Sequence, residues 1–194
     1  SNLKSQGVTA HQVPEIPYTK GGTGFIIDSK GYLVTNNHVI EGAKNVAVQN
    51  AAGKEFYATV VYSDAAADIA ILKITDQDFK PLPSVPYSFS RKQADLAESI
   101  YTMGYPRDEI VYGQGYLSSK TGYNGDTLSC QIDIPVNRGN SGSPVLSPSG
   151  EIIGIVNGRQ KDAQGSAFAL QSRNIFNALS KLKETETEDS TSRN

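Results

Sequence analysis

The chain has 194 residues, and its 18 Lys and Arg residues against 20 Asp and Glu residues give a formal net charge of -2 at pH 7. This balance argues against nucleic-acid binding through a basic face. Hydrophobic residues make up 38% of the chain, which is too apolar for disorder, while 18 Gly and 9 Pro residues are too many for a helical bundle. Composition therefore favours a turn-rich, mostly β protein, built as one larger domain or as two small lobes.

The single cysteine, Cys130, excludes an intrachain disulfide and is expected to be a small core residue. Two histidines argue against a multi-His metal site, although Asp and Glu could still bind a hard cation. We therefore expect chemistry by ordinary side chains, without metal or cofactor. No window approaches about 18 consecutive apolar residues, so membrane contact is expected only through segments outside this chain. Because Ser1 is not a natural initiator, an upstream signal peptide or anchor is expected.

In chain order, the first predicted element is an extended arm over residues 1–20, which contains Pro14 and Pro17. Two short apolar runs, Phe25–Ile27 and Tyr32–Val34, then flank a hairpin turn. Further strands are expected at Asn45–Gln49, Phe56–Tyr62, Ile69–Ile74, Ser99–Met103, Ile110–Ser118, Thr127–Ile132, Val145–Leu146, Glu151–Asn157 and Ser166–Leu170. Many short strands with turns between them are typical of a sandwich or barrel.

The remaining segments connect or close this array. Asp76–Gln93 carries three prolines and predicts a crossover between two halves. Apolar residues recur at helical spacing within Gln171–Leu182, so one amphipathic helix is expected there. Residues 183–194 contain no apolar side chain, which predicts a solvated tail or linker, or simply a frayed terminus.

A serine lies in a glycine-rich turn signal at Arg138–Pro144, where Ser141 stands between Gly139 and Gly142. Only a tight turn without Cβ atoms would direct the Ser141 hydroxyl and the backbone N–H groups of Gly139 and Ser141 toward one point. This is the geometry that an oxyanion hole needs. For this segment alone, an ordinary turn between strands is an equally good interpretation.

His38 stands just after the apolar strand Tyr32–Val34. A neutral imidazole in that place could accept a hydroxyl proton near pH 7. A lone histidine at a strand end is more often a hydrogen-bonded structural residue. His11, in the proline-flanked arm, has no comparable setting, so His38 is the histidine that we single out.

Asp68 directly precedes the run Ile69–Ile74, whose near-continuous apolar character predicts a strand buried on both faces. A carboxylate at the mouth of such a strand needs a partner, and the Nδ1–H group of a histidine is a suitable donor that also fixes the imidazole tautomer. The alternative is a turn aspartate that captures backbone N–H groups, as expected for Asp64 just upstream.

The three candidates follow the chain order His38, Asp68, Ser141, each at the edge of a predicted strand. An α/β-hydrolase would run Ser, Asp, His and would carry a Gly-x-Ser-x-Gly elbow before a helix. Here position 143 is Ser and no helix is expected after it. Both observations argue against that arrangement.

Five segments between Gly21 and Leu182 form a recognisable set: Gly22–Ile27, Thr35–Ile40, Ala67–Lys73, Asn137–Gly142 and Gly150–Ile155. In them the chain resembles the chymotrypsin-like serine proteases of bacteria, and most closely the HtrA (Deg) protease domain. The resemblance implies an all-β, trypsin-like fold of two six-stranded antiparallel β-barrels with the active site between them and a C-terminal helix. It implies a domain at 21–182, with a first barrel at about 21–78, a crossover at about 79–95, a second barrel at about 96–170 and the helix at 171–182.

The resemblance also implies roles. Ser141 would be the nucleophile, His38 the general base and then acid, and Asp68 the orienting carboxylate. The backbone N–H groups of Gly139 and Ser141 would form the oxyanion hole. The implied reaction is peptide hydrolysis through an acyl-enzyme.

One departure from the HtrA pattern concerns specificity. Ser143 replaces the usual second glycine after the nucleophile, which looks more like the glutamyl endopeptidase and exfoliative-toxin branch. That branch usually has a histidine after its late Gly-Ile pair, whereas here Val156 and Asn157 follow Gly154-Ile155. The expected pocket residues are Ile134, Pro135, Val136, Val156 and Asn157, and their apolar members favour a small or medium apolar substrate side chain.

The sequence thus predicts a serine endopeptidase that acts on polypeptides, unfolded proteins among them, in HtrA-like protein quality control. A bacterial extracytoplasmic location is expected, and a homo-oligomer is possible. One alternative is a catalytically silent trypsin-like scaffold that binds proteins. The other is a secreted exoprotease of the glutamyl-endopeptidase type.

Overall fold

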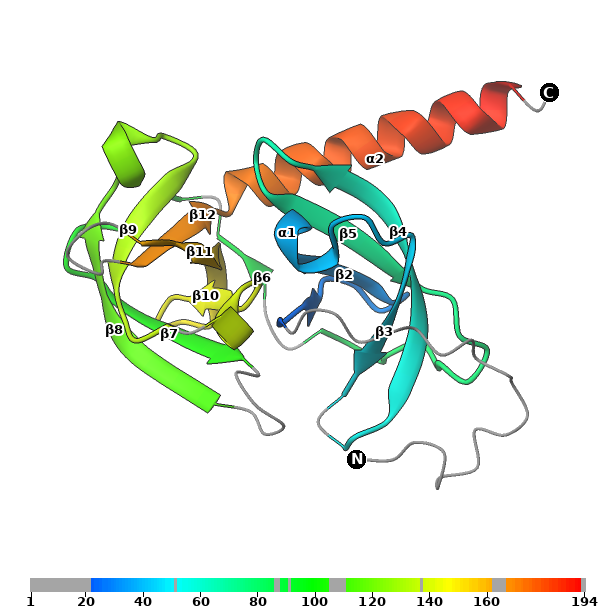
Figure 1. Ribbon diagram of the computed structural model, residues 1–194, viewed down its shortest axis with the longest axis horizontal. Helices are drawn as coiled ribbons and strands as arrows, with labels where there is room; N and C mark the ends of the chain where they lie inside the picture. The colour runs from blue at the N-terminus through cyan, green and yellow to red at the C-terminus, as the bar shows by residue number, and fades with distance from the viewer. Residues whose placement is uncertain are drawn as a thin grey trace.

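The structure is a computed structural model that describes residues 22–50, 52–85, 88–90, 92–104, 111–136, 138–161 and 167–192. For Arg138, residues 158–161 and Ser192 it describes the backbone alone. The predicted arm over residues 1–20 lies outside the described residues. Two β lobes stand side by side, and a long C-terminal helix leaves the second lobe and crosses the first (Figure 1).

The first lobe is an antiparallel sheet of five strands in the order β1-β2-β5-β4-β3. The strand bounds are β1 Phe25–Ile26, β2 Tyr32–Thr35, β3 Asn45–Gln49, β4 Glu55–Asp64 and β5 Ile69–Ile74. Its core consists of the buried side chains Leu33, Ile40, Ala58, Ala70, Leu72 and Ile74. The predicted six-stranded closure is not found among the described residues, because β1 spans only two residues and pairs with β2 alone.

The side chain of Asp28 and the backbone of Gly31 shape the turn between β1 and β2. The Asp28 carboxylate Oδ1 accepts hydrogen bonds from the backbone N–H groups of Lys30, Gly31 and Tyr32, at 3.0–3.1 Å. Gly31 lies at φ +100°, in the left-handed region that glycine adopts without steric cost. The hairpin prediction for this segment is therefore confirmed.

The second lobe closes into a barrel. Six strands follow the order β10-β7-β8-β9-β12-β11, and β11 pairs again with β10, while β6 adds a short parallel pairing to β11. The bounds are β6 Ser88–Phe89, β7 Ser99–Gly104, β8 Val111–Ser119, β9 Ser129–Asp133, β10 Pro144–Leu146, β11 Glu151–Lys161 and β12 Ala167–Gln171. The chain passes from the first lobe to the second between β5 and β6. The expected two-lobed, mostly β fold is confirmed.

Glycines on β8 allow this barrel to close tightly. A Cβ atom built on Gly115 would lie 1.8 Å from the carbonyl oxygen of Asp133, and one built on Gly113 would lie 2.7 Å from Thr102 Oγ1. No side chain can occupy such a distance without moving the neighbouring backbone or side chain. The outward positions between them carry larger side chains, so β8 alternates between close packing inside and exposed residues outside.

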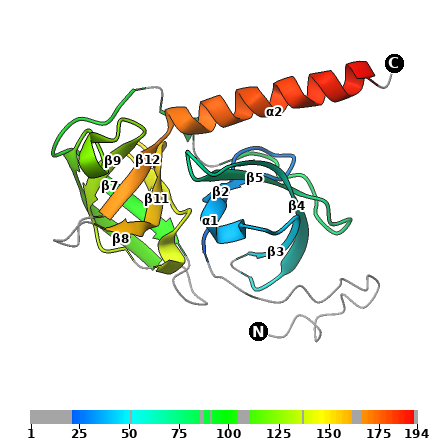
Figure 2. The ribbon, with the colours of Figure 1, turned by 45° about the horizontal axis from the view of Figure 1, so that its top comes forward.

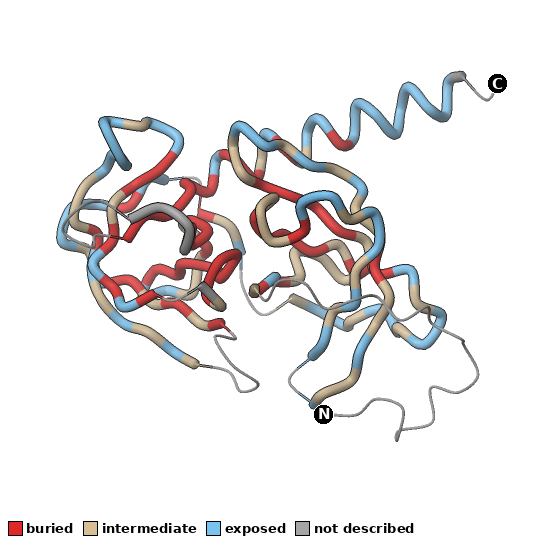
Figure 3. Tube along the Cα trace, in the orientation of Figure 1, coloured by how far each residue is buried: buried red, intermediate tan, exposed pale blue. Residues whose placement is uncertain are grey.

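Helix α2, Arg173–Ser192, joins the two lobes through a shared core. Its buried residues Ile175, Ala178 and Leu182 pack with residues of both lobes: Phe25, Val34, Ile69 and Ile71 from the first, and Leu146, Ile152, Ile155 and Leu170 from the second. Figure 3 shows the buried start of the helix and its exposed end. Two further short helices, α1 Asn37–Ile40 and η3 Tyr123–Gly125, lie in connections.

The helix is longer than the sequence predicts. It continues from Leu182 to Ser192, over residues expected to form a solvated tail, and residues 183–191 are exposed. Lys and Glu have high helix propensity, and the Thr185 hydroxyl donates to the Lys181 carbonyl, so the last turns form without an apolar face. In the part of the chain that the structure describes, no helix combines the length and apolarity needed to cross a membrane.

Candidate active site

The predicted catalytic residues come from three elements that meet where the two lobes face each other. His38 lies on α1, which Figures 1 and 2 both show on the side of the first lobe that faces the second. Asp68 directly precedes β5, and Ser141 follows the short 3₁₀ helix η4, Arg138–Asn140. A Cβ atom built on Gly22 would lie 2.7 Å from Val39 Cγ1 and 3.2 Å from the Ser141 carbonyl oxygen. Helix α1 and the serine turn therefore approach each other across a glycine.

His38 and Asp68 form a close pair. The distance from His38 Nδ1 to Asp68 Oδ2 is 2.7 Å, and the other carboxylate oxygen, Oδ1, accepts the backbone N–H of His38 at 2.8 Å. Their side chains are 15% and 18% exposed, so water screens the pair only in part. With Nδ1–H as the donor to Asp68, Nε2 is the ring nitrogen left to accept a proton.

Asp68 itself is held from several directions. Its backbone lies at φ +56°, in the left-handed region that non-glycine residues seldom adopt. Asn36 Nδ2 donates to the Asp68 carbonyl oxygen at 3.0 Å, and Asn157 Nδ2 on β11 of the second lobe reaches Asp68 Oδ2 at 3.4 Å. An unfavourable backbone conformation kept in place by such contacts is typical of functional sites.

Ser141 lies in a tight turn whose next residue must be glycine. Ser141 is 2% exposed, and Gly142 adopts φ +90°. A Cβ atom on Gly142 would stand 1.9 Å from the Thr23 carbonyl oxygen, so the first lobe presses directly on this turn. The Gly142 N–H donates to the carbonyl of Val156 on β11 at 3.0 Å. The turn is thus fixed between β11 and the residues that lead into β1.

Three consecutive carbonyl groups of this turn have hydrogen-bond donors. The Gly139 carbonyl accepts from Thr23 Oγ1 at 2.8 Å, the Asn140 carbonyl from the Ser143 N–H at 2.9 Å, and the Ser141 carbonyl from the Thr23 N–H at 2.8 Å. Within the described residues no hydrogen bond joins the Ser141 hydroxyl to His38. The structure therefore brings His38 and Asp68 into contact and sets Ser141 opposite them without a direct bond.

The predicted pocket residues have different settings. Ile134, Val136 and Val156 are 5%, 6% and 0% exposed and belong to the core of the second lobe. Pro135 is exposed, and Asn157 is 6% exposed, with its amide directed to Asp68. The sequence grouped these residues by position along the chain, whereas alternation along the strand sends neighbouring side chains to different places.

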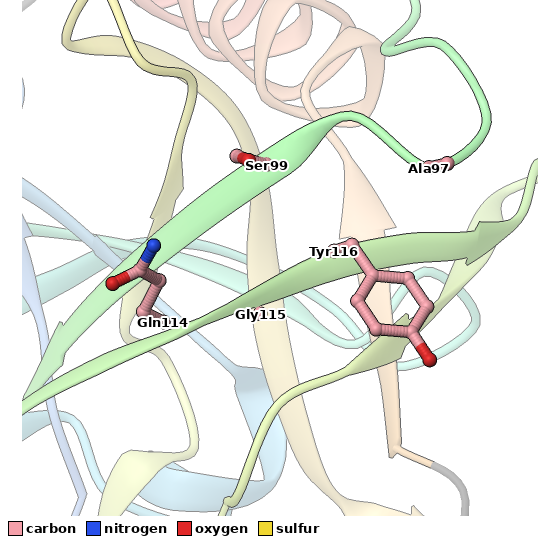
Figure 4. Close-up of a pocket in the computed structure, with 5 residues that line it drawn as sticks. All are labelled: Ala97, Ser99, Gln114, Gly115 and Tyr116. Atoms are coloured by element: carbon pink, nitrogen blue, oxygen red, sulfur yellow. The ribbon is translucent and has the colours of Figure 1, made fainter.

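A cavity of about 590 Å³ lies elsewhere, on the second lobe (Figure 4). Ala97, Ser99, Gln114, Gly115 and Tyr116 line it, and none of them is a predicted site residue. Asp133 accepts a hydrogen bond from the Tyr116 hydroxyl and thereby raises the pKa of Tyr116. This cavity contains none of the chemistry that His38, Asp68 and Ser141 would supply.

Other reactive groups are not arranged for catalysis. Burial raises the pKa of the Cys130 thiol to about 12, so it is not a thiolate at neutral pH. Among the residues that the structure describes, no three His, Cys, Asp or Glu side chains gather closely enough to hold a metal ion. Ser141 is the better candidate nucleophile.

The sequence interpretation missed two supporting residues. Thr23 contacts the serine turn through its N–H, hydroxyl and carbonyl groups, yet it was noted only as part of a glycine-rich segment. Asn36 supports the Asp68 backbone from the residue before α1. Both are polar residues beside predicted strands, and their burial, at 4% and 0% exposure, becomes evident only in the structure.

Comparison with known proteins identifies the family of this chain. Residues 22–155 match the family described as "Trypsin-like peptidase domain". The chain is 31% identical over 175 residues to the probable periplasmic serine endoprotease DegP-like of Hahella chejuensis, and 30% identical over 159 residues to the serine endoprotease DegS of Escherichia coli. These alignments cover 84% and 79% of this chain but 36% and 44% of the relatives. The chain thus spans less than half of the length of either relative.

A solved structure extends the comparison to the fold. The serine endoprotease from Yersinia pestis superposes with a TM-score of 0.70 and 27% sequence identity, over 86% of this chain and 59% of that one. The family match covers most of the residues from β1 to β11, including His38, Asp68 and Ser141. The chain therefore belongs to the family of trypsin-like peptidase domains, and its resemblance to HtrA-type proteases is confirmed.

Proposed function

We propose that this chain hydrolyses peptide bonds as a serine endopeptidase of the HtrA type. The observation that carries the proposal is the His38–Asp68 pair at 2.7 Å, set across Gly22 from the turn that holds Ser141. A histidine oriented by a carboxylate activates a serine hydroxyl that is otherwise a weak nucleophile. Family membership supports the same chemistry.

In the first half of the reaction, His38 Nε2 accepts the Ser141 hydroxyl proton while Ser141 Oγ bonds to the scissile carbonyl carbon. Asp68 holds the ring through Nδ1 and stabilises the imidazolium that forms. His38 then donates its proton from Nε2 to the leaving amine, and the C–N bond breaks. The acyl group remains on Ser141.

In the second half, His38 takes a proton from water as the water oxygen attacks the acyl carbon. The ester bond to Ser141 breaks, and the serine recovers its proton from His38. The backbone N–H groups of Gly139 and Ser141 would stabilise the negative oxygen in both halves, and losing one such donor typically costs about 3 kcal/mol. The contact of the Asn140 carbonyl with the Ser143 N–H supports this role for Ser141, because it fixes the peptide plane that carries the Ser141 N–H.

We propose polypeptides as substrates, cleaved after small or medium apolar residues, with Ile134, Pro135, Val136, Val156 and Asn157 as pocket residues. The apolar character of the first four supports this preference. A peptide library scored for the residue before the cut tests it: cleavage mainly after Val, Ala or Leu is expected, and cleavage mainly after Glu, Lys or Arg would contradict it.

The names of known relatives guide the proposal for the biological setting. A relative named as periplasmic supports an extracytoplasmic location for this chain, and its activity on proteins supports a role in quality control of unfolded polypeptides. Self-association into a homo-oligomer is part of the same proposal. Size-exclusion chromatography with light scattering and fractionation of cells expressing the protein test these two points.

A fluorophosphonate probe tests the catalytic proposal directly, because it reacts with an activated serine. We expect labelling of the wild-type protein and none of Ser141→Ala or His38→Ala. Ser149→Ala, an exposed-turn serine variant, is the matched control and should label normally, since its hydroxyl bonds only to Ser147. A folded wild-type protein that resists labelling would favour a catalytically silent scaffold.

A further inference from the structure

We propose that the side chain of Thr23 is a positioning residue for the oxyanion-hole turn, holding a second-lobe loop from the first lobe. The inference rests on the proposed function, because it presupposes that the N–H groups of Gly139 and Ser141 act as donors. It assigns a role to a residue that lies far from Ser141 in the sequence. Thr23 would not touch substrate; it would act through the turn.

The contacts of Thr23 bracket the turn. Its hydroxyl donates to the Gly139 carbonyl at 2.8 Å, and its N–H donates to the Ser141 carbonyl at 2.8 Å. Its own carbonyl accepts from the hydroxyl of Thr35, on β2, at 2.8 Å. Thr23 is therefore anchored to the first lobe and bonded to the residues on either side of Asn140.

Peptide geometry explains why these bonds matter. In a trans peptide the C=O and N–H groups point in opposite directions, so fixing a carbonyl also fixes the next N–H. The Ser143 N–H holds the Asn140 carbonyl at 2.9 Å, and this orients the Ser141 N–H. The Thr23 N–H holds the Ser141 carbonyl, and the Gly142 N–H on the same peptide plane meets Val156 on the opposite side.

Gly139 is the residue of this turn with the greatest intrinsic freedom, because glycine lacks the Cβ atom that limits φ and ψ. Its N–H is a proposed donor to the oxyanion, and the peptide plane that follows it is the one that Thr23 Oγ1 holds. The hydroxyl thus restricts rotation about the Cα–C bond of Gly139. Because the Ser141 carbonyl is held as well, the planes on both sides of the Asn140–Ser141 peptide are fixed, and this peptide carries the Ser141 N–H.

Burial makes the hydroxyl contact effective. Thr23 is 4% exposed and Asn140 is 5% exposed, so water competes little for the Gly139 carbonyl. Gly104 on β7 closes the space: a Cβ atom there would lie 3.1 Å from Thr23 Oγ1 and 3.0 Å from Asn140 Nδ2. The contact therefore lies in a closely packed, mostly dry environment behind the turn.

The test compares Thr23→Val, which keeps the shape and removes the donor, with Thr23→Ser, which keeps the donor. For a chromogenic peptide we expect Thr23→Val to lower kcat about tenfold with little change in KM, and Thr23→Ser to restore most of it. A peptide boronate, whose adduct with Ser141 places an oxygen in the oxyanion hole, should lose affinity by a similar factor. If Thr23 had a purely structural role, Thr23→Val would not lower kcat and boronate affinity together while KM stayed constant.

Thr102→Val is the matched control, because Thr102 is a threonine of similar burial on β7 and, in the part of the chain that the structure describes, forms no hydrogen bond with residues 139–141. It should leave kcat within about twofold of the wild type. If Thr23→Val does not fold, Thr23→Ala with a thermal unfolding curve replaces it.

Two results with Thr23→Val overturn the proposal: a folded protein with unchanged kcat, or one in which KM alone rises. Failure of the catalytic proposal is a different result, because the folded wild-type protein would then be inactive, or Ser141→Ala would keep its activity, whatever happens at Thr23. Equal losses in Thr23→Val and Thr23→Ser would also contradict a role for the hydroxyl.

Discussion

The two halves of the candidate site are held in different ways. The His38–Asp68 half forms almost wholly within the first lobe, through a side-chain pair and the support of Asn36. The serine turn belongs to the closed barrel of the second lobe, yet two of its carbonyls are held by Thr23 of the first. The acid-base half is therefore complete in one lobe, whereas the nucleophile half is complete only when both lobes are docked.

This difference indicates where the site is vulnerable. A change in the first lobe at Asp68 should affect the chemistry without disturbing the fold. A change that separates the lobes should affect the serine turn first. Four substitutions, from the largest expected effect to the smallest, test this distinction.

Asp68→Asn removes the charge that orients His38 while keeping the shape and the tolerance of asparagine for φ +56°. We expect kcat to fall about 10⁴-fold, because the imidazole is then held in the wrong tautomer, with little change in the melting temperature. Steady-state kinetics and a thermal scan check this. Asp64→Asn is the control: Asp64 only caps the backbone of Ala66 and Ala67, so activity should persist.

Gly142→Ala breaks the docking of the serine turn against the first lobe. The added Cβ would lie 1.9 Å from the Thr23 carbonyl, so the turn must shift, and we expect kcat/KM to fall about 100-fold. Gly150→Ala separates this clash from backbone strain, since Gly150 lies at φ +82° with no atom within 4 Å of the new Cβ. Equal activity losses in the two variants would show that strain alone is responsible.

Asn157→Leu removes the contact through which the second lobe reaches Asp68. Because the distance is 3.4 Å, we expect a loss of only about tenfold in kcat, the size of one hydrogen bond to a charged group at its weak end. Cleavage preference, measured on a peptide library, tests the proposed pocket role of Asn157 separately. An unchanged kcat would contradict a contribution from the Asp68 contact.

Ser143→Ala should have the smallest effect. Ser143 is fully buried and its hydroxyl has no hydrogen-bond partner among the described residues, in contrast to the Thr23 hydroxyl beside the same turn. Removing an unsatisfied buried hydroxyl is expected to stabilise the protein by about 0.5–1 kcal/mol. Urea unfolding monitored by circular dichroism measures this, and clear destabilisation would mean that the hydroxyl has a partner such as ordered water.

The sequence predicted the strands well because they alternate or run apolar between strong turn signals. The Asp28–Gly31 turn and the buried strand β5 form as expected, since local chemistry decides both. Closure of the first lobe was predicted from resemblance and does not appear in the described residues, because closure depends on which edges meet in space. The end of α2 was placed too early, because helix propensity alone continues it beyond the last apolar residue, Leu182.

The reactive residues of the candidate site could be predicted from the sequence, but the residues that hold them in place could not. His38 and Asp68 stand at strand ends that pair β2 with β5, so local rules bring them together. Thr23 meets the serine turn only through docking of the lobes, and no spacing in the sequence reports that contact.

At Asp68, stability and activity favour different residues, because the backbone conformation suits glycine while His38 needs a carboxylate. A left-handed conformation costs a non-glycine residue about 1 kcal/mol, so glycine would be the more stable choice at φ +56°. Glycine has no carboxylate, and the substitution would leave His38 without its partner. A search for stabilising substitutions, made without regard to function, would therefore select against the residue that orients His38.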